Sequence, residues 1–484
     1  MNRYKPKELF IFSLEGQRFL MEPDKCAAYD IDEMAEMLLI ANEPLTKEEA
    51  LAKLNAEDSA DAEELFDGLV ELGLLQDVDA PKKDPENIAS QEEDLSLSSL
   101  VLNVAQGCNM RCSYCFADHG VYHDEQKMMS RETAERAVDF LAGSTKRSYL
   151  YVYFFGGEPL LNKDVVLHTV RYTNAKAAEL GKDTMFGITT NGTILDDEIL
   201  ACFDDNKFAV LVSSDGPKNI HDKQRSMANG DGSFDIVQRN LLKLSEYKNI
   251  YLGCRATSTA ENSSIMEVVK YLDTFPLKYC HIEPAARSTQ EADANNNDHE
   301  NLNIDAFLKE YGDVVKLMWQ KMKNKESVPY RTFLNEIKML IGNTVRQRLC
   351  NMGFGTVTVS AEGDIYACQR LVGEPGQILG SVYTPDILSV FKPHIPLTLD
   401  EKDECPSCWA RYLCVGDCVA ESILRYGDER PRLASRCHFK REKLKWTIWI
   451  YSKMLSEMER DDIDAIFMEG NSQYNKLTLD QLGI

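Results

Sequence analysis

Between Leu100 and about Ala286, apolar and polar positions follow a repeating strand-and-helix pattern. Short runs rich in branched and aromatic residues alternate with longer stretches whose apolar residues recur every three or four positions. This alternation is typical of βα units and predicts an α/β fold built on a parallel sheet. We expect six strands, at Leu100–Val104, Leu150–Phe155, Thr184–Thr189, Ala209–Ser213, Ile250–Arg255 and Tyr279–Glu283.

The regions on either side of this repeat have different patterns. Residues 8–30 predict short strands and are followed by three amphipathic helical stretches, so we expect a small winged-helix-like α+β domain over residues 1–80. Residues 81–99 are rich in charge and serine and predict a flexible linker. The repeat is assigned to residues 100–300, a helical bridging region to 301–345, an irregular cysteine-rich region to 346–440, and a helix and tail to 441–484.

Glycines and polar residues directly follow most of the expected strands. The segment from Cys108 to Cys115 follows the first strand. Gly156-Gly157-Glu158-Pro159, Asn191-Gly192-Thr193 and Asp215-Gly216-Pro217 follow the next three. In βα barrels and open α/β sheets, ligands bind outside the carboxyl ends of the strands. The sequence therefore predicts a single binding site at that edge of the sheet.

The charge of the chain narrows the possible functions. A net charge of −24 over 484 residues argues against a nucleic-acid partner, because phosphates require a basic surface. Residues 1–80 hold 20 acidic and 7 basic side chains, which indicates either a solvated acidic face or a domain that attracts a basic peptide. No apolar run is long enough to span a membrane and no signal core is present, so we expect a cytoplasmic protein without membrane contacts.

Ten of the fourteen cysteines fall into two sets. In the cytosol, such close spacings indicate metal ligands rather than disulfides. The first set supplies three thiolates, which can hold a [4Fe–4S] cluster and leave one iron open to a ligand that is not protein. The first set is Cys108, Cys112 and Cys115, and the second is Cys350, Cys368, Cys405, Cys408, Cys414, Cys418 and Cys437. The other four cysteines are expected to be small buried apolar residues.

The spacing Cys108-x3-Cys112-x2-Cys115, with a strand before it and polar strand ends after it, resembles the radical S-adenosylmethionine (SAM) superfamily. The resemblance covers residues 100–286 and implies a partial (β/α)6 barrel. It also implies that SAM binds the open iron and is cleaved to a 5′-deoxyadenosyl radical, which abstracts hydrogen from a substrate. A zinc site is the alternative for these three cysteines.

The same resemblance implies a set of SAM contacts, although each residue alone is equally consistent with a turn or a packed side chain. Glycines permit a close backbone approach, and the planar fork of an arginine suits a carboxylate. The implied contacts are Gly156, Gly157 and Glu158 for the methionine amino group, Asn191, Ser214 and Asp215 for the ribose, Arg255 for the carboxylate, and Tyr114 and Phe116 for the adenine. The segment Asp215–Arg225 also resembles sulfatase and peptide maturases, but His221, Asp222 and Arg225 are equally expected to brace the next helix.

The second cysteine set resembles the SPASM extension of radical SAM enzymes, with Cys405-x2-Cys408-x5-Cys414-x3-Cys418 preceded by Gly363-x4-Cys368. The resemblance implies two auxiliary [4Fe–4S] clusters. One is implied on Cys405, Cys408, Cys414 and Cys437, and the other on Cys350, Cys368 and Cys418. Fully ligated relatives have one more cysteine, whereas residues 351–367 contain none, so we hypothesise an open site for a substrate thiolate. A zinc ribbon is the alternative, which iron content and visible absorbance distinguish.

Two further features point to a class of reaction. Gln369 stands where sulfatase-maturing relatives usually have a catalytic Asp, which weakens an assignment to sulfatase maturation. The N-terminal domain resembles the leader-binding domain of peptide-modifying enzymes. These features predict an oxidoreductase of the sactipeptide and ranthipeptide maturase type, which forms thioether crosslinks in a ribosomally made (RiPP) precursor peptide. The expected partners are this precursor with its leader and an electron donor such as flavodoxin or ferredoxin.

Two alternatives stay open at this point. One is another radical SAM/SPASM modification, such as a carbon–carbon crosslink or a side-chain oxidation. The other is an electron-transfer or scaffold protein that never cleaves SAM, which the absence of 5′-deoxyadenosine after reduction with SAM and peptide would indicate.

Overall fold

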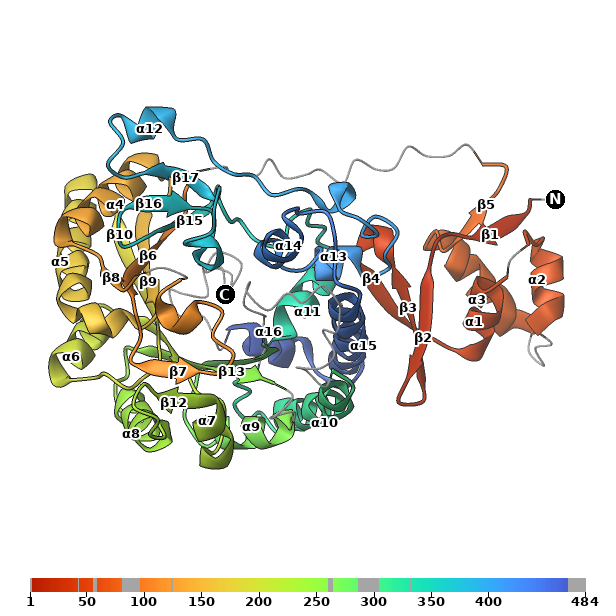
Figure 1. Cartoon of the computed structure of the whole chain (residues 1–484). Helices are drawn as coiled ribbons and strands as arrows, with labels where there is room; N and C mark the ends of the chain where they lie inside the picture. The colour runs from red at the N-terminus through yellow and green to blue at the C-terminus, as the bar shows by residue number, and fades with distance from the viewer. Residues whose placement is uncertain are drawn as a thin grey trace.

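The structure of the chain is a computed structural model that describes residues 2–41, 43–54, 59–80, 96–122, 125–259, 264–285, 304–330 and 332–468. An N-terminal unit lies at one end of the molecule, and a large α/β body with a helical C-terminal half makes up the remainder (Figure 1). None of the helices in these residues is long and apolar enough to cross a membrane.

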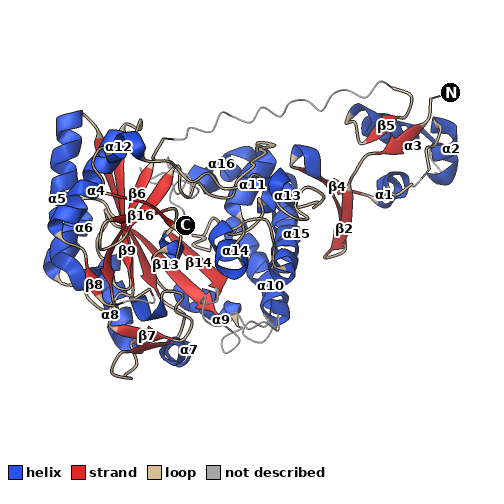
Figure 2. Cartoon of the chain, turned by 45° about the horizontal axis from the view of Figure 1, so that its top comes forward, coloured by secondary structure: helices blue, strands red, loops and turns tan. Residues whose placement is uncertain are grey.

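A parallel sheet forms the centre of the body and confirms the α/β prediction. Its six parallel strands lie in the order β14-β13-β11-β10-β9-β6, with the outer helices against one face (Figure 2). The strands are β6 (Ser99–Gln106), β9 (Tyr149–Gly156), β10 (Asp183–Thr190), β11 (Ala209–Ser213), β13 (Tyr251–Ser258) and β14 (Tyr279–Pro284). Each begins within one residue of its expected start.

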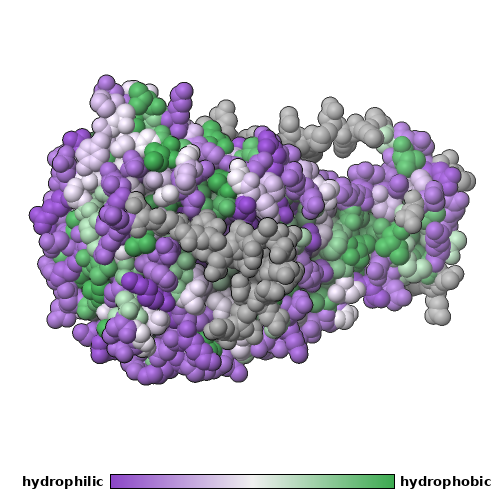
Figure 3. Space-filling model, in the orientation of Figure 1, coloured by the Kyte–Doolittle hydropathy of each residue, from purple (hydrophilic) through white to green (hydrophobic). Residues whose placement is uncertain are grey.

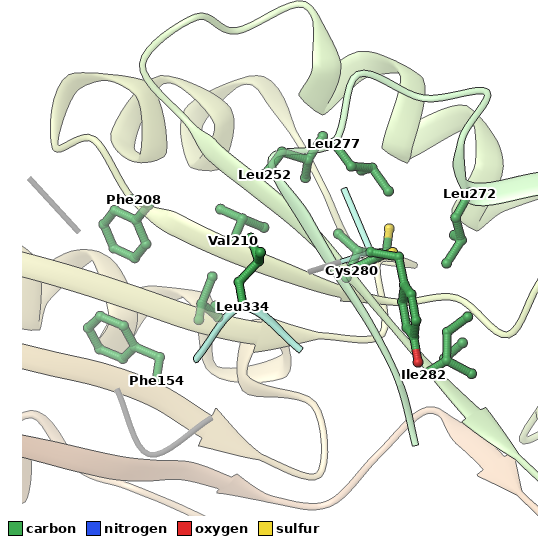
Figure 4. Close-up of a cluster of buried hydrophobic side chains, with 14 of the residues drawn as sticks. Phe154, Phe208, Val210, Leu252, Leu272, Leu277, Cys280, Ile282 and Leu334 are labelled. Atoms are coloured by element: carbon green, nitrogen blue, oxygen red, sulfur yellow. The ribbon is translucent and has the colours of Figure 1, made fainter. Parts of the chain in front are cut away.

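Residues at every second strand position pack against the outer helices, as Figure 4 shows for Phe154, Val210 and Leu252. The helices are α4 (Arg131–Ser144), α5 (Lys163–Leu180), α6 (Asp197–Asp205), α7 (Lys218–Gln224), α8 (Phe234–Ser245) and α9 (Ile265–Leu272). Side chains such as Ser130 and Asp196 accept hydrogen bonds from the first turns of their helices and fix where these begin. The inner face carries a second cluster that includes Tyr151 and Met185, so the barrel is filled at its base.

The sheet continues beyond β6 with strands that the sequence did not indicate. β15 (Thr356–Val359) pairs in parallel with β6, and β16 (Asp364–Tyr366) and β17 (Ile378–Ser381) extend it antiparallel. The expectation of an irregular region from 346 to 440 is therefore wrong for these segments. The strands are only three or four residues long, too short for alternation to be visible in the sequence.

The N-terminal unit has a three-stranded antiparallel sheet with two apolar faces. The strands β2 (Phe10–Leu14), β3 (Gln17–Glu22) and β4 (Ala27–Ile31) are followed by α1 (Glu33–Leu39), α2 (Lys47–Leu54) and α3 (Ser59–Glu71), and β1 (Tyr4–Pro6) pairs with β5 (Leu75–Asp77). Leu20 packs toward the helices, whereas Phe12 and Phe19 join the core of the body. The sheet therefore connects the two parts.

The C-terminal half holds the N-terminal unit and the body together. Its helices are α10 (Ile304–Lys323), α11 (Leu334–Ile341), α12 (Ile387–Val390), α13 (Arg411–Cys414), α14 (Val419–Tyr426), α15 (Ala434–Glu457) and α16 (Arg460–Met468). The long helix α15 packs on α10 and also contacts β2 and β4 (Figure 1). The sequence predicts a helix within residues 441–484, and α15 contains it but begins earlier, at Ala434.

Candidate metal centres and cofactor site

The first cysteine set gathers on the loop that leaves β6. Within it, β7 (Met110–Cys112) pairs with β12 (Arg225–Met227), which ties the loop to the segment after α7. The thiols of Cys112 and Cys115 both act on the pKa of Cys108, so the three thiols are electrostatic neighbours on this loop. Burial, followed by Glu158, raises the pKa of Cys108 to about 12. Binding to iron is what would deprotonate such thiols, since metal ligation requires the thiolate.

The donor set of the first loop is three cysteine thiols, which is the set that a [4Fe–4S] cluster with one open iron requires. In the part of the chain that the structure describes, no group of three His, Cys, Asp or Glu side chains is close enough to hold one metal ion.

The two glycines after β9 allow the cysteine loop to lie directly against the strand end. A Cβ on Gly156 would lie 2.4 Å from the carbonyl oxygen of Ala105. A Cβ on Gly157 would lie 2.3 Å from the carbonyl oxygen of Gly107 and 2.8 Å from Cα of Gly120. Any side chain at these positions would push the loop away. A direct contact of the two glycines with SAM stays a prediction.

Glu158 braces the ends of β9 and β10 from a fully buried position. Its carboxylate accepts hydrogen bonds from the backbone N–H groups of Leu160 at 3.0 Å and Asn191 at 2.6 Å, and from the hydroxyl of Thr190 at 2.8 Å. Burial raises the pKa of Glu158 to about 7, although these hydrogen bonds act in the opposite direction. The carboxylate is thus used inside the protein and holds Asn191 beside Cys108.

Asp215 and Tyr114 form a second internal brace. The Tyr114 hydroxyl donates to Oδ2 of Asp215 at 2.8 Å, and the backbone N–H of Thr257 donates to Oδ1 at 3.0 Å. Arg225 donates to the Tyr114 hydroxyl, and its guanidinium lies 5.9 Å from the centre of that ring. Nδ1 of His221 accepts from the backbone N–H of Asp215. The bracing interpretation of His221 and Arg225 therefore has direct support, and SAM contacts of Tyr114 and Asp215 stay predictions.

Strand alternation separates the serines that follow β11. Ser214, the residue implied as a ribose contact, is 1% exposed and lies near Tyr271 on α9. Ser213 is half-buried and shares the inner face with Leu211. Ser213 is therefore better placed than Ser214 for a ligand at this edge. The sequence could not indicate this difference, because packing decides which face of the strand points into the barrel.

Arg255 lies on the inner face of β13, opposite His281 on β14 in the strand register. Its side chain is exposed, and no ion pair of Arg255 occurs among the described residues. Burial, followed by the charge of Arg255, lowers the pKa of His281 to about 4. The guanidinium is thus available to a carboxylate inside the barrel, and its contact with SAM stays a prediction.

Three cysteines of the second set meet next to the first set. Cys418 and Cys350 both act on the pKa of Cys368, which burial raises to about 12. These thiols share an apolar cluster with Cys115 and Phe116. Arg370 donates to Sγ of Cys418 at 3.7 Å and to Glu421 at 2.6 Å, and its guanidinium lies 5.6 Å from the centre of the Phe116 ring. Phe116 therefore faces the second cysteine set as well as the first.

The other four cysteines of the second set gather at the start of α15. Cys414 and Cys405 act on the pKa of Cys437, and Cys408 acts on that of Cys405. Arg436 donates to Asp417 at 3.1 Å beside them. Cys408 also lines a cavity of about 520 Å³ together with Phe10, Trp409, Arg441 and Lys445. The two groupings of the second set are those that the SPASM resemblance implied.

Comparison with known proteins agrees with this arrangement. The radical SAM superfamily model matches residues 102–254. A cysteine-type anaerobic sulfatase-maturating enzyme of Clostridium novyi (strain NT) is 26% identical over 340 residues, covering 67% of this chain and 88% of the relative. A serine-type anaerobic sulfatase-maturating enzyme of Bacteroides thetaiotaomicron is 24% identical over 362 residues, which cover 70% of this chain and 86% of the relative. The solved structure of native anSMEcpe with bound AdoMet and Kp18Cys peptide has a TM-score of 0.63 at 20% identity, covering 75% of this chain and 99% of that chain.

The parallel sheet and the three-cysteine loop agree with the family match, which indicates a radical SAM enzyme. This family implies SAM and a [4Fe–4S] cluster. Its similarity in sequence is to anaerobic sulfatase-maturating enzymes. This similarity does not extend to the thioether-forming type that the sequence predicts.

Several residues of the site carried no clear signal in the sequence. Asn103 is fully buried in β6, and Tyr122 and Arg370 lie between the two cysteine sets. Arg370 stands two residues beyond Cys368, and this closeness to a predicted metal ligand is a signal that could have identified it. The meeting of these residues depends on the folded chain.

Proposed function

We propose that this radical SAM enzyme forms thioether crosslinks, from a cysteine sulfur to a carbon, in a ribosomally made precursor peptide. The observation that carries the proposal is the group formed by Cys350, Cys368 and Cys418 beside the radical SAM loop. Three thiolates are one fewer than a closed [4Fe–4S] site requires, so an auxiliary cluster there would have an iron available to a peptide thiolate.

The reaction removes one hydrogen from a carbon and one from sulfur. When bound, the cluster and SAM supply a 5′-deoxyadenosyl radical, which takes the hydrogen atom from the carbon and becomes 5′-deoxyadenosine. The cysteine thiol gives up its proton, the sulfur–carbon bond forms, and the electron left over requires an acceptor. An auxiliary cluster held by Cys350, Cys368 and Cys418 would provide this acceptor beside the first cysteine set. The side chains of Phe116 and Arg370 line the path between the two cysteine sets.

The N-terminal unit is proposed to bind the leader of the peptide. Within the described residues, β2 and β4 each pair with β3 alone, which leaves one edge of each strand for an added strand. Apolar side chains gather on the surface of this unit near the body (Figure 3). Its excess of acidic residues favours a basic leader. The solved structure of anSMEcpe contains a peptide, which supports a peptide as the substrate class.

Electrons are proposed to enter from a flavodoxin or a ferredoxin. The four-cysteine group on Cys405, Cys408, Cys414 and Cys437 lies near the surface, where Cys408 lines a cavity. A closed auxiliary cluster at this place would suit electron transfer rather than substrate binding, since all four of its irons would be held by protein.

The proposal is tested with short cysteine-rich peptides encoded near this protein, incubated anaerobically with reductant and SAM. We expect a product lighter by two hydrogen atoms whose cysteine no longer reacts with iodoacetamide. Cys418→Ala should abolish the crosslink but leave SAM cleavage intact, whereas Cys202→Ala on α6 should change neither. A modified peptide that keeps all its free thiols would contradict thioether formation.

Side-chain oxidation, as in sulfatase maturation, is the second candidate because the curated relatives are sulfatase-maturating enzymes. Gln369 disfavours it, since an amide is a poor base for removing the proton of a serine or cysteine side chain. A peptide carbonyl that reacts with a hydrazide probe, formed by the unmodified chain, would favour this candidate. If a carboxylate base at position 369 is what separates side-chain oxidation from thioether formation, Gln369→Asp should raise the yield of the peptide carbonyl.

A further inference from the structure

Tyr122 carries a hydroxyl group that is buried beside both cysteine sets. Its side chain is 2% exposed, and its oxygen is among the buried polar atoms without a partner in the described part of the chain. It approaches the side-chain amide of Asn103, whose nitrogen and oxygen are likewise buried and unbonded. A buried unsatisfied group of this kind costs about 1–3 kcal/mol. Two such groups at one point indicate that a polar partner belongs there.

The surroundings of this hydroxyl are the thiols of both cysteine sets. Cys115, Cys368 and Cys108 all act on it electrostatically. The Tyr122 ring packs edge-on against Phe116, with 6.3 Å between ring centres. Of these three thiols, that of Cys115, on the loop after β6, has the strongest effect on the hydroxyl.

The backbone holds Tyr122 in this position at a cost. Its φ is +55°, a left-handed conformation that is rare for a bulky residue and costs on the order of 1–3 kcal/mol. Its N–H donates to the carbonyl of Ala117 at 2.9 Å. A Cβ on Gly373 would lie 2.5 Å from the Tyr122 carbonyl oxygen, so the cysteine-rich region packs directly on this residue. Strain of this kind is typical of residues that are placed for function.

We propose that the Tyr122 hydroxyl donates a hydrogen bond to a sulfur atom of the cluster held by Cys108, Cys112 and Cys115. Tyr122 is then a positioning residue that tunes this cluster and separates it from the auxiliary site. A donor to sulfur stabilises the more negative, reduced cluster and raises its potential. The inference rests on the radical SAM part of the proposed function and does not depend on thioether formation.

The test is Tyr122→Phe in the full chain, which removes the hydroxyl and keeps the ring and its backbone demands. After anaerobic reconstitution, a redox titration followed by electron paramagnetic resonance should place the SAM-responsive cluster at a more negative potential than in the wild type. The auxiliary signals should not move. Without iron, the variant should melt at a higher temperature than the wild type because an unsatisfied hydroxyl is gone. The increase in melting temperature when the cluster is loaded should be smaller in the variant than in the wild type.

Tyr330→Phe is the matched control. Tyr330 is 1% exposed and also has a hydroxyl without a hydrogen bond among the described residues, but its electrostatic neighbours are Glu283, Cys280 and Glu336. This variant should gain stability without iron and leave every potential unchanged. An unchanged SAM-responsive potential in Tyr122→Phe, or a shift confined to the auxiliary signals, overturns the inference. Absence of any SAM-responsive signal in the wild type would overturn the proposed function with it.

Discussion

The side-chain nitrogen of Asn191 lies 3.7 Å from Sγ of Cys108, within hydrogen-bond distance for sulfur. The same nitrogen lies 2.8 Å from Oδ1 of Asn109, and the Asn191 oxygen accepts from Thr193. Asn191 is 5% exposed, so this contact is shielded from water. The end of β10 is thus bonded to the loop that carries the first cysteine set, and a donor points at a cluster ligand.

Replacing Asn191 by Asp should weaken cluster binding at the first cysteine set. The variant loses the N–H donor and places a carboxylate beside the Cys108 thiolate. Groups that contact metal ligands typically contribute 10–100-fold to metal affinity, so we expect the iron of this cluster to be lost about ten-fold faster to a chelator. Asn174→Asp, at a half-buried position on α5, is the control and should retain iron as the wild type does. Equal loss rates for both variants would contradict the contact.

The free energy of unfolding should fall as pH rises through the range in which Glu158 ionises. Its folded-state pKa is raised from 4.5 to about 7, so its contribution is fully present below about pH 4.5 and is lost by about pH 7. The shift corresponds to about 3 kcal/mol. Denaturant unfolding of the iron-free protein between pH 5 and 8 measures this slope. In Glu158→Gln the free energy of unfolding should depend less on pH. At low pH this variant should be less stable than the wild type, because its amide N–H₂ would face a backbone or hydroxyl donor. An identical slope in both proteins would show that Glu158 does not titrate here.

The N-terminal unit should loosen when Trp409 is replaced by Ala. The Trp409 ring stacks on Phe10 with 4.3 Å between ring centres and only 2° between the planes. Such a pair contributes about 0.5–1.5 kcal/mol beyond its buried area. Hydrogen exchange of β2 and β3 should therefore speed up, with that of β9 and β10 unchanged. Tyr426→Ala, at an exposed position on α14, should leave all four strands as they are. Unaltered exchange in β2 would mean that other contacts, such as Arg411 with Asp24, hold the unit alone.

Arg255 should react readily with phenylglyoxal, and SAM should protect it. The side chain is exposed on the inner face of the barrel, and a SAM carboxylate bound there would block the guanidinium. Mass spectrometry of the modified peptides should show a several-fold slower reaction of Arg255 in the reconstituted protein with SAM. Arg171, exposed on the outer helix α5, should react at the same rate with and without SAM. Protection by a substrate peptide but not by SAM would reassign Arg255 to substrate binding.

Local patterns were sufficient to predict the six strands, because strand alternation involves residues close in sequence. The two groupings of the second cysteine set were implied by the SPASM resemblance, and the thiols of each grouping are neighbours in the structure. Glycines after β9 were also visible as a motif, and the structure gives the physical reason, a loop that packs on their Cα atoms.

The tertiary structure alone decided how these parts meet. β15 joins the sheet because Thr356 pairs with Ser99, residues separated by 257 positions, and no local pattern encodes such a pairing. The same long-range packing turns Ser214 away from the inner face toward α9, uses Asp215 as an internal brace and brings Tyr122 between the two cysteine sets. Spacing therefore determined which residues can bind metal, whereas packing between distant segments determined which side chains face the site, because burial and inner or outer orientation are properties of the whole fold.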